Sequence, residues 1–170
     1  MTTQEWLIQV IGTQFAGRCH PLTIMNWLRN PKFYPDGLPG VGLLFLRIFA
    51  GYAMAQHGLP KISNPFNWMG PDAGVPSILQ ALAAISEFGG GLALMFGAFT
   101  PLACLGIMST MFVAALSHIM RGDPFIGRNG SWELAGIYFI IALTLLLTGP
   151  GRLSFDYFVF GRKKEAANQA

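Results

Sequence analysis

Residues 88–117 read FGGGLALMFGAFTPLACLGIMSTMFVAALS, a run of thirty residues without Asp, Glu, Lys, Arg or His. A helix needs roughly 20 mostly apolar residues to cross about 30 Å of hydrocarbon. Thr100-Pro101 interrupts the run, and proline favours the first turn of a helix over its interior. The run therefore predicts two membrane-spanning helices joined by a tight turn.

Comparable apolar stretches lie on both sides of this run. The sequence predicts four spans, at residues 38–57, 78–99, 101–120 and 132–148. Gly149-Pro150-Gly151 ends the fourth span, and prolines fill the loop after the first. The predicted fold class is all-α, with a four-transmembrane-helix antiparallel bundle over residues 38–160.

The composition supports this class and excludes others. The chain is 52% hydrophobic and 11% charged, whereas soluble domains carry about 25% charged residues. The mean hydropathy is +0.46. Disordered chains, nucleic-acid-binding proteins and disulfide-stapled scaffolds need low hydrophobicity, clustered basic residues and many cysteines, respectively. We therefore expect an integral membrane protein that does not bind nucleic acid.

The two ends of the chain differ from the bundle. Within residues 1–37, apolar side chains recur near helical spacing and glutamines fall on the opposite face. This pattern predicts a short amphipathic helix in the headgroup plane. Residues 161–170 form a basic, polar tail. The predicted cytoplasmic side carries seven Lys and Arg residues and the opposite side carries three. The positive-inside rule therefore predicts that both termini are cytoplasmic, in a bacterial inner or internal membrane.

Two ionisable residues are predicted near mid-membrane. Arg47 lies nine residues into the first span, roughly 14 Å deep, and Glu87 lies roughly 15 Å from the same surface. Buried charges are costly and call for a partner or a purpose. We therefore expect Arg47 and Glu87 to form an intramembrane ion pair, which either fixes the helix register or borders a ligand or proton path.

A second polar group is predicted at the opposite end, where the up-down topology brings three span ends together. Its candidate ligand-binding residues are His57, Lys61, His118, Arg121 and Glu133. Histidine, lysine and glutamate supply the hydrogen bonds and protons that a quinone headgroup needs. The alternative is that these residues only cap helices and snorkel. No compact metal-binding spacing is present, so no metal is predicted.

The order and spacing of these residues resemble the DoxX family of small integral membrane proteins. The matching pieces are Arg47, His57-Gly58-x-x-Lys61, Glu87-x-Gly89-Gly90, Gly97-x-x-Thr100-Pro101, His118, Glu133 and Gly149-Pro150-Gly151-x-x-Ser154-x-Asp156. The resemblance covers about residues 38 to 158. It implies a four-helix membrane protein and a link to quinone or sulfur redox chemistry, since the family name is tied to terminal-oxidase-associated and thiosulfate:quinone oxidoreductase subunits.

Three functions remain open at this point. The leading hypothesis is an accessory or quinone-interacting subunit of a membrane redox complex. Such a subunit need not be catalytic itself, because the sequence encodes no redox centre or cofactor site and its two cysteines, Cys19 and Cys104, are far apart. The second hypothesis is a structural or assembly subunit that packs against other membrane proteins through small residues. The third is a small anion or metabolite transporter.

Overall fold

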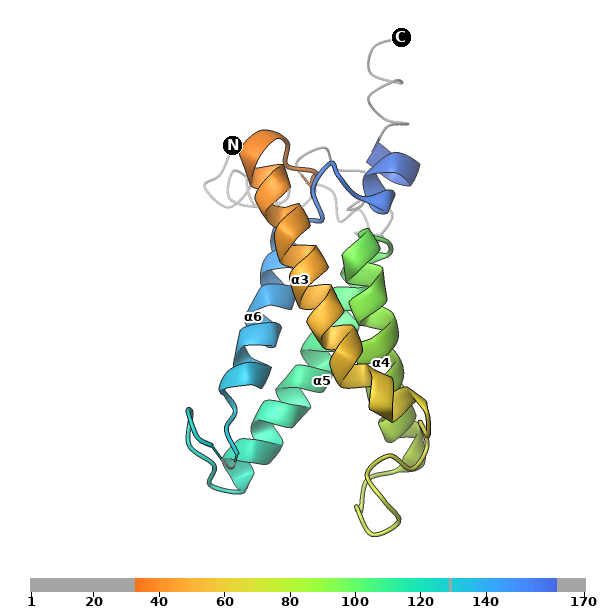
Figure 1. The fold of residues 1–170 in the computed structure, drawn as a ribbon, viewed down its shortest axis with the longest axis vertical. Coiled ribbons are helices and arrows are strands. Elements are labelled where there is room, and N and C mark those ends of the chain that lie inside the picture. The colour runs from red at the N-terminus through yellow and green to blue at the C-terminus, as the bar shows by residue number, and fades with distance from the viewer. Residues whose placement is uncertain (1–32, 129, 162–170) are drawn as a thin grey trace, which may run out of the picture.

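The described part of the chain consists of helices and loops, without strands. The computed structural model describes residues 33–128 and 130–161. Its elements are α3 (Gly37–Ile62), α4 (Ser77–Phe96), α5 (Thr100–Met120), α6 (Glu133–Thr148) and the short π-helical turn η2 (Tyr157–Gly161). The four long helices alternate in direction (Figure 1). The predicted all-α bundle is confirmed, whereas the predicted N-terminal amphipathic helix and most of the basic tail lie outside the described residues.

The helices differ in length. Three of them, α3, α4 and α5, are long and apolar enough to cross a membrane. The fourth, α6, has 16 residues and is therefore about 24 Å long at 1.5 Å per residue. It is apolar throughout but shorter than its three neighbours.

Glycine, proline and capping residues set the helix ends. The Asp36 carboxylate accepts a hydrogen bond from Gly37 N at 2.8 Å, at the start of α3. Gly97 ends α4 in the left-handed region at φ +62°, where glycine has no steric penalty. Phe99 also has a positive φ, of +48°, and Pro101 follows in the first turn of α5. These residues fold the tight turn that the interrupted apolar run predicts.

Small residues bring α3 and α4 into backbone contact. A Cβ atom on Gly91 would lie 2.5 Å from the Ala55 nitrogen, and one on Gly51 would lie 2.6 Å from the Gly91 carbonyl oxygen. A Cβ atom on Gly58 would overlap the Phe88 backbone. Such close approach is the usual role of small residues between membrane helices. It makes α3 and α4 a tightly packed pair.

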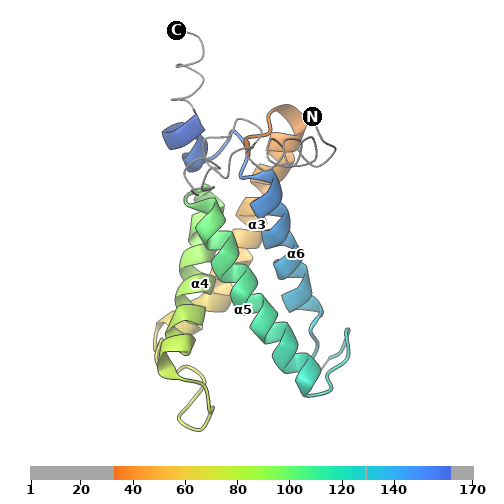
Figure 2. The ribbon, with the colours of Figure 1, turned by 180° about the vertical axis from the view of Figure 1, so that it is seen from behind.

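The bundle has two unlike ends. Neighbouring helices pack in chain order, α3 on α4, α4 on α5 and α5 on α6, while α3 and α6 meet at few points. At one end, residues 149–161 cross over the helix ends. At the other end, the α3–α4 pair and the α5–α6 pair lie apart, each with its own loop (Figures 1 and 2). We refer to these as the closed end and the open end.

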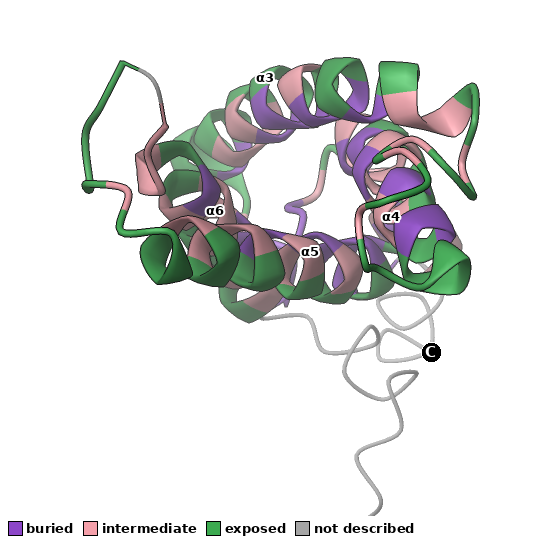
Figure 3. Cartoon of the chain, turned by 90° about the horizontal axis from the view of Figure 1, so that it is seen from below, coloured by how far each residue is buried: buried purple, intermediate pink, exposed green. Residues whose placement is uncertain are grey.

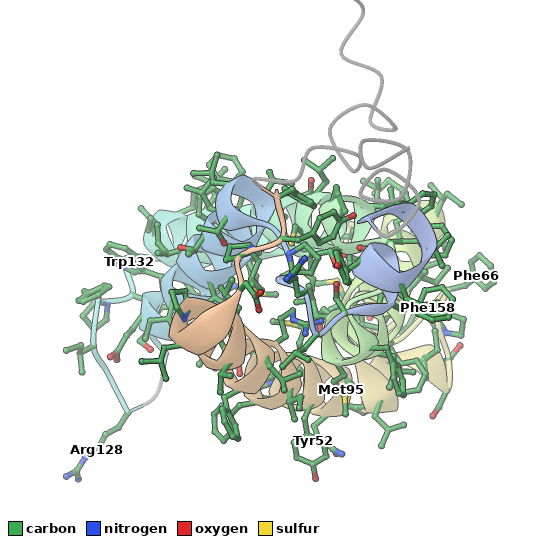
Figure 4. The ribbon with its side chains drawn as sticks, turned by 90° about the horizontal axis from the view of Figure 1, so that it is seen from above. Tyr52, Phe66, Met95, Arg128, Trp132 and Phe158 are labelled. Atoms are coloured by element: carbon green, nitrogen blue, oxygen red, sulfur yellow. The ribbon has the colours of Figure 1, made fainter. Side chains whose placement is uncertain are left out.

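Buried positions lie on the helix faces that point into the bundle, and exposed positions lie on the faces that point outward (Figure 3). The core includes Met54, Leu94, Ile107 and Leu145, each at most 2% exposed. Tyr52 of α3 points away from the bundle (Figure 4). Large exposed apolar residues occur on all four helices, as expected for surfaces that contact lipid. The protein therefore sits in a bilayer.

Candidate functional site at the open end

A charged pair lies where α3 ends beside α4. Lys61 Nζ donates to both carboxylate oxygens of Glu87, each at 2.6 Å. The Glu87 side chain is 3% exposed and the Lys61 side chain is 23% exposed. A buried carboxylate is stable only when it is paired and hydrogen-bonded, and this lysine meets that requirement. The pair thus places a buried carboxylate and a partly exposed ammonium side by side near the open end of the bundle.

The loop between α3 and α4 covers this pair. The Trp68 ring lies against Lys61, with Nζ 4.5 Å from the ring centroid, in a cation–π contact. Trp68 Nε1 donates to the Gln80 carbonyl oxygen at 2.9 Å. The Gln80 side chain is itself buried, at 3% exposure. The lysine ammonium is therefore held between a carboxylate on one side and an aromatic ring on another.

His57 occupies the same face of α3, one helical turn before Lys61. Its ring packs edge-on against Tyr138 of α6, with 6.1 Å between the ring centroids. Neither ring has a hydrogen-bond partner within the described chain. The contact bridges two helices that otherwise touch little, so it places a titratable ring and a phenol between the two helix pairs.

The predicted ion pair between Arg47 and Glu87 is wrong, because both residues have other partners. Arg47 lies beside Gly97, where a Cβ atom would overlap its Nη1. Since Arg47 is ten residues into α3, the start of α3 extends about 15 Å beyond the end of α4. Depths counted from the two helix ends therefore refer to different levels. Arg47 belongs to the closed end, and Glu87 lies near enough to the open end for Lys61 to reach it.

Arg47 and Asp156 hold the closed end together. Arg47 is fully buried, and its Nη2 donates to the Leu153 carbonyl oxygen at 2.5 Å. Asp156 accepts hydrogen bonds from Phe99 N at 2.7 Å and Thr100 N at 2.8 Å. These amides open α5, so a carboxylate from beyond α6 caps a helix more than fifty residues earlier in the chain. The polar groups of this end are used to join helix ends.

Two of the remaining predicted residues, His118 and Arg121, form a separate group with Asp123 at the end of α5. His118 Nδ1 lies 2.8 Å from Asp123 Oδ2, and Arg121 Nε donates to the same oxygen at 3.4 Å. The His118 hydrogen bond, together with Arg121, lowers the pKa of Asp123 below its usual value. Arg121 Nη2 lies 3.0 Å from His118 Nδ1. A guanidinium only donates and an ionised carboxylate only accepts. His118 Nδ1 can therefore either donate to Asp123 or accept from Arg121, but not both at once.

The structure therefore divides the five candidate residues rather than gathering them. His57 and Lys61 share a face of α3. His118 and Arg121 lie at the end of α5, in the part of the open end that the α5–α6 pair forms (Figure 1). Glu133 begins α6. Within residues 33–128 and 130–161 no group of three His, Cys, Asp or Glu side chains could hold a metal ion.

Sequence reasoning missed four residues that shape the two ends: Trp68, Gln80, Tyr138 and Asp156. The signal for Asp156 was present, because the Ser154-x-Asp156 spacing follows the helix-ending Gly149-Pro150-Gly151. Trp68 and Gln80 had no comparable signal, since a loop of prolines and glycines does not reveal how it folds back. Tyr138 looked like any other aromatic residue of an apolar span.

Comparisons with known proteins agree with this architecture. The DoxX family model matches residues 42–119. A Bacillus subtilis protein named "Putative oxidoreductase CatD" is 29% identical over 128 residues, which cover 73% of this chain and 91% of the relative. "Inner membrane protein YqjF" of Escherichia coli is 30% identical over 127 residues, covering 70% of this chain and 92% of the relative.

No solved structure matches this chain. The family evidence therefore comes from the sequence relatives and from the helical bundle, which agree. The matched segment runs from early α3 almost to the end of α5 and includes Arg47, Lys61 and Glu87. This chain belongs to the DoxX family of integral membrane proteins.

Proposed function

We propose that the chain is a quinone-interacting subunit of a membrane redox complex and that the quinone headgroup binds at the open end. A redox-associated role agrees with the oxidoreductase name of the Bacillus subtilis relative. The observation that carries the proposal is the Lys61–Glu87 pair, whose carboxylate is almost fully buried while its lysine remains partly exposed.

The chemistry of a quinone suits these residues. Its two carbonyl oxygens accept hydrogen bonds, and its ring is flat and apolar. Lys61 carries three N–H donors and directs two of its hydrogen bonds at Glu87. His57 and Tyr138 have polar atoms without partners in the described chain. Lys61 and His57 thus supply donors on one helix face, with the Tyr138 hydroxyl opposite.

Proton supply is the second part of the proposal. Reducing a quinone to a quinol takes two electrons and two protons. A redox centre on a partner subunit supplies the electrons, because no such centre is encoded here. For each electron delivered, the Lys61 ammonium gives one proton to a ligand oxygen inside the bundle and takes one back from water at the rim. The Glu87 carboxylate stays ionised and holds the re-formed ammonium in place, so two such cycles supply the two protons of the quinol.

The test is a binding titration in detergent that uses Trp68 as the reporter. The protein would carry Trp6→Phe, Trp27→Phe and Trp132→Phe, so that quenching by decyl-ubiquinone or menadione reports the open end. We expect saturable quenching in the parent protein. The apparent dissociation constant should rise at least fivefold in Lys61→Met and in His57→Ala. His118→Ala is the matched control, because that histidine lies at the end of α5, on the other helix pair. The quinone affinity of this variant should be unchanged.

The same titration would refute the proposal in two ways. Quenching that never saturates would mean that the quinone only partitions into the micelle. Saturable quenching with equal affinity in the parent, Lys61→Met and His57→Ala would place the ligand elsewhere. Glu87→Gln adds a further check, because it should impair binding while the protein still inserts and accumulates in membranes.

A structural or assembly role is the second candidate. It is favoured by the large exposed apolar residues on every long helix, which a partner membrane protein could cover in place of lipid. Purification of the native complex separates the two roles. A stable complex whose activity survives Lys61→Met, Glu87→Gln and His57→Ala would favour scaffolding, and loss of activity with the complex intact would favour the quinone site.

The orientation is also part of the proposal. We place both termini on the cytoplasmic side of a bacterial inner membrane. The excess of Lys and Arg in the terminal segments supports this orientation, and the named location of the Escherichia coli relative supports the membrane. On this placement the open end faces away from the cytoplasm.

A further inference from the structure

The loop at residues 63–76 is fastened to the first turns of α4 by one buried side chain. Gln80 Oε1 accepts a hydrogen bond from Met69 N at 3.1 Å, and Gln80 Nε2 donates to the Val75 carbonyl oxygen at 2.9 Å. The backbone carbonyl of the same residue accepts from Trp68 Nε1. One residue therefore ties both halves of the loop to the helix.

The fastening determines where the Trp68 ring lies. With its indole nitrogen bound to the Gln80 carbonyl, the ring covers the Lys61 ammonium. A single cation–π contact is weak enough for a loop to lose and regain during function. Phe66 and Met69 of the same loop are exposed, so the loop is held at a few points and is not buried as a whole.

We infer that the 63–76 loop is a lid over the Lys61–Glu87 pair, with Trp68 as its seal and Gln80 as the positioning residue that keeps the seal closed. The Gln80 side chain acts through Met69 and Val75. Its removal loosens the loop that carries the Trp68 ring, which then keeps only the hydrogen bond to the Gln80 backbone carbonyl, while the Lys61–Glu87 pair stays intact.

The use of the lid rests on the proposed function. If the ligand lies between α3 and α6, on the His57 side of Lys61, then Trp68 stands on the water side of the same ammonium. The closed lid keeps the charged pair out of bulk water, and an open lid lets the pair exchange protons with it. The lid thereby sets the rate of proton exchange rather than the affinity for the ligand.

Amine labelling tests the lid without any ligand and keeps the Lys61–Glu87 pair intact. A membrane-impermeant N-hydroxysuccinimide ester would acylate the Lys61 amine beneath Trp68 slowly. In a Ser63→Lys background it would acylate the added amine, at an exposed position outside the seal, quickly, and peptide mass spectrometry reads the two rates separately. Adding Gln80→Leu should raise the labelling rate at position 61 at least tenfold and leave that at position 63 unchanged.

Two matched substitutions separate the lid from general loosening. Gln56→Leu makes the same change on an exposed face of α3 and should alter neither rate. Gln80→Glu retains an acceptor for Met69 N but loses the donor to Val75, and should give an intermediate rate. Trp68→Ala removes the seal from the loop side, so it gives the same test if a Gln80 variant fails to fold.

Equal labelling at position 61 in the parent, Gln80→Leu and Trp68→Ala would overturn the lid. The outcome is independent of the quinone titration. A lid that opens in a protein that binds no quinone would refute the proposed function alone, and saturable quinone binding with unchanged labelling would refute the lid alone.

Discussion

The closed end and the open end of the bundle use buried charge in opposite ways. At the closed end, Asp156 is 1% exposed and gives both carboxylate oxygens to backbone amides of the α4–α5 turn. At the open end, Glu87 is nearly as buried but gives both oxygens to a side chain that reaches the surface. Backbone amides at the start of a helix cannot move away from the carboxylate, whereas a lysine side chain can.

This difference separates a carboxylate held by the backbone from one held by a side chain. A carboxylate that caps a helix stabilises one arrangement of the chain. A carboxylate paired with a partly exposed lysine has a partner that can turn away from it, which is what the proposed ligand site requires. Burial alone does not distinguish the two residues, and the identity of the partner does.

The largest effect is expected at the closed end. Asp156→Ala should lower the free energy of unfolding by about 3–5 kcal/mol, because one buried and one partly buried amide lose their acceptor and the buried Arg47 loses the opposite charge of Asp156. Asp72→Ala, in the exposed part of the 63–76 loop, is the control and should change stability by less than about 0.5 kcal/mol. Unfolding in mixed detergent–SDS micelles measures both. A small effect of Asp156→Ala would mean that the closed end is not held by this cap.

The pair at the open end should respond asymmetrically. Lys61→Met leaves the buried Glu87 without a partner and should cost about 2–3 kcal/mol. Glu87→Gln leaves a lysine that can still turn to water, so it should cost only about 1 kcal/mol. The same unfolding assay compares them. If Glu87→Gln destabilised the protein as much as Lys61→Met or more, the result would contradict the claim that Glu87 is the more buried partner.

The packing of α3 against α4 is tested at two nearby glycines of α4, Gly91 and Gly89. Gly91→Ala should destabilise by about 1–3 kcal/mol through overlap with α3, whose Ala55 nitrogen is the nearest atom. Gly89→Ala meets nothing nearer than 3.9 Å and should be neutral or slightly stabilising. Thermal unfolding in detergent separates the variants. Equal melting temperatures would show that α3 and α4 do not pack through Gly91.

The smallest effect should be the pH dependence of stability that arises from Asp123, at the end of α5. The pKa of Asp123 is lowered by His118 and Arg121, so the charged form stabilises the folded state. The contribution is complete above the unfolded value of about 3.9 and is lost as the pH falls through the lowered folded value. The melting temperature of Asp123→Asn should therefore lie below that of the parent at pH 6 and approach it below pH 4, whereas the difference for Asp72→Asn should stay constant.

The sequence was sufficient for α3 to α6 and their order. Apolar runs punctuated by glycine and proline placed these four helices, three of which are long enough to cross a membrane, because membrane insertion depends on length and composition, which are local properties. The predicted start of the first span was one residue late, and its end was five residues early because the helix continues through Pro60.

The partners of the charged residues could not be obtained in the same way. The pairing of Arg47 with Glu87 assumed that all helices begin at a common surface, and the backbone contacts through Gly51 and Gly91 shift α3 relative to α4. The expected meeting of His57 with His118 assumed that the open end converges, whereas the two helix pairs lie apart there. Register and crossing depend on contacts between distant residues, which no span-by-span pattern contains.

A double-mutant cycle on the free energy of unfolding tests most directly whether Glu87 belongs to Lys61 or to Arg47. Lys61→Met and Glu87→Gln should be coupled by about 1–2 kcal/mol, as residues in direct contact are, while Arg47→Met and Glu87→Gln should add to within about 0.5 kcal/mol. Additivity in the first cycle together with coupling in the second would contradict the partition of charge between the two ends.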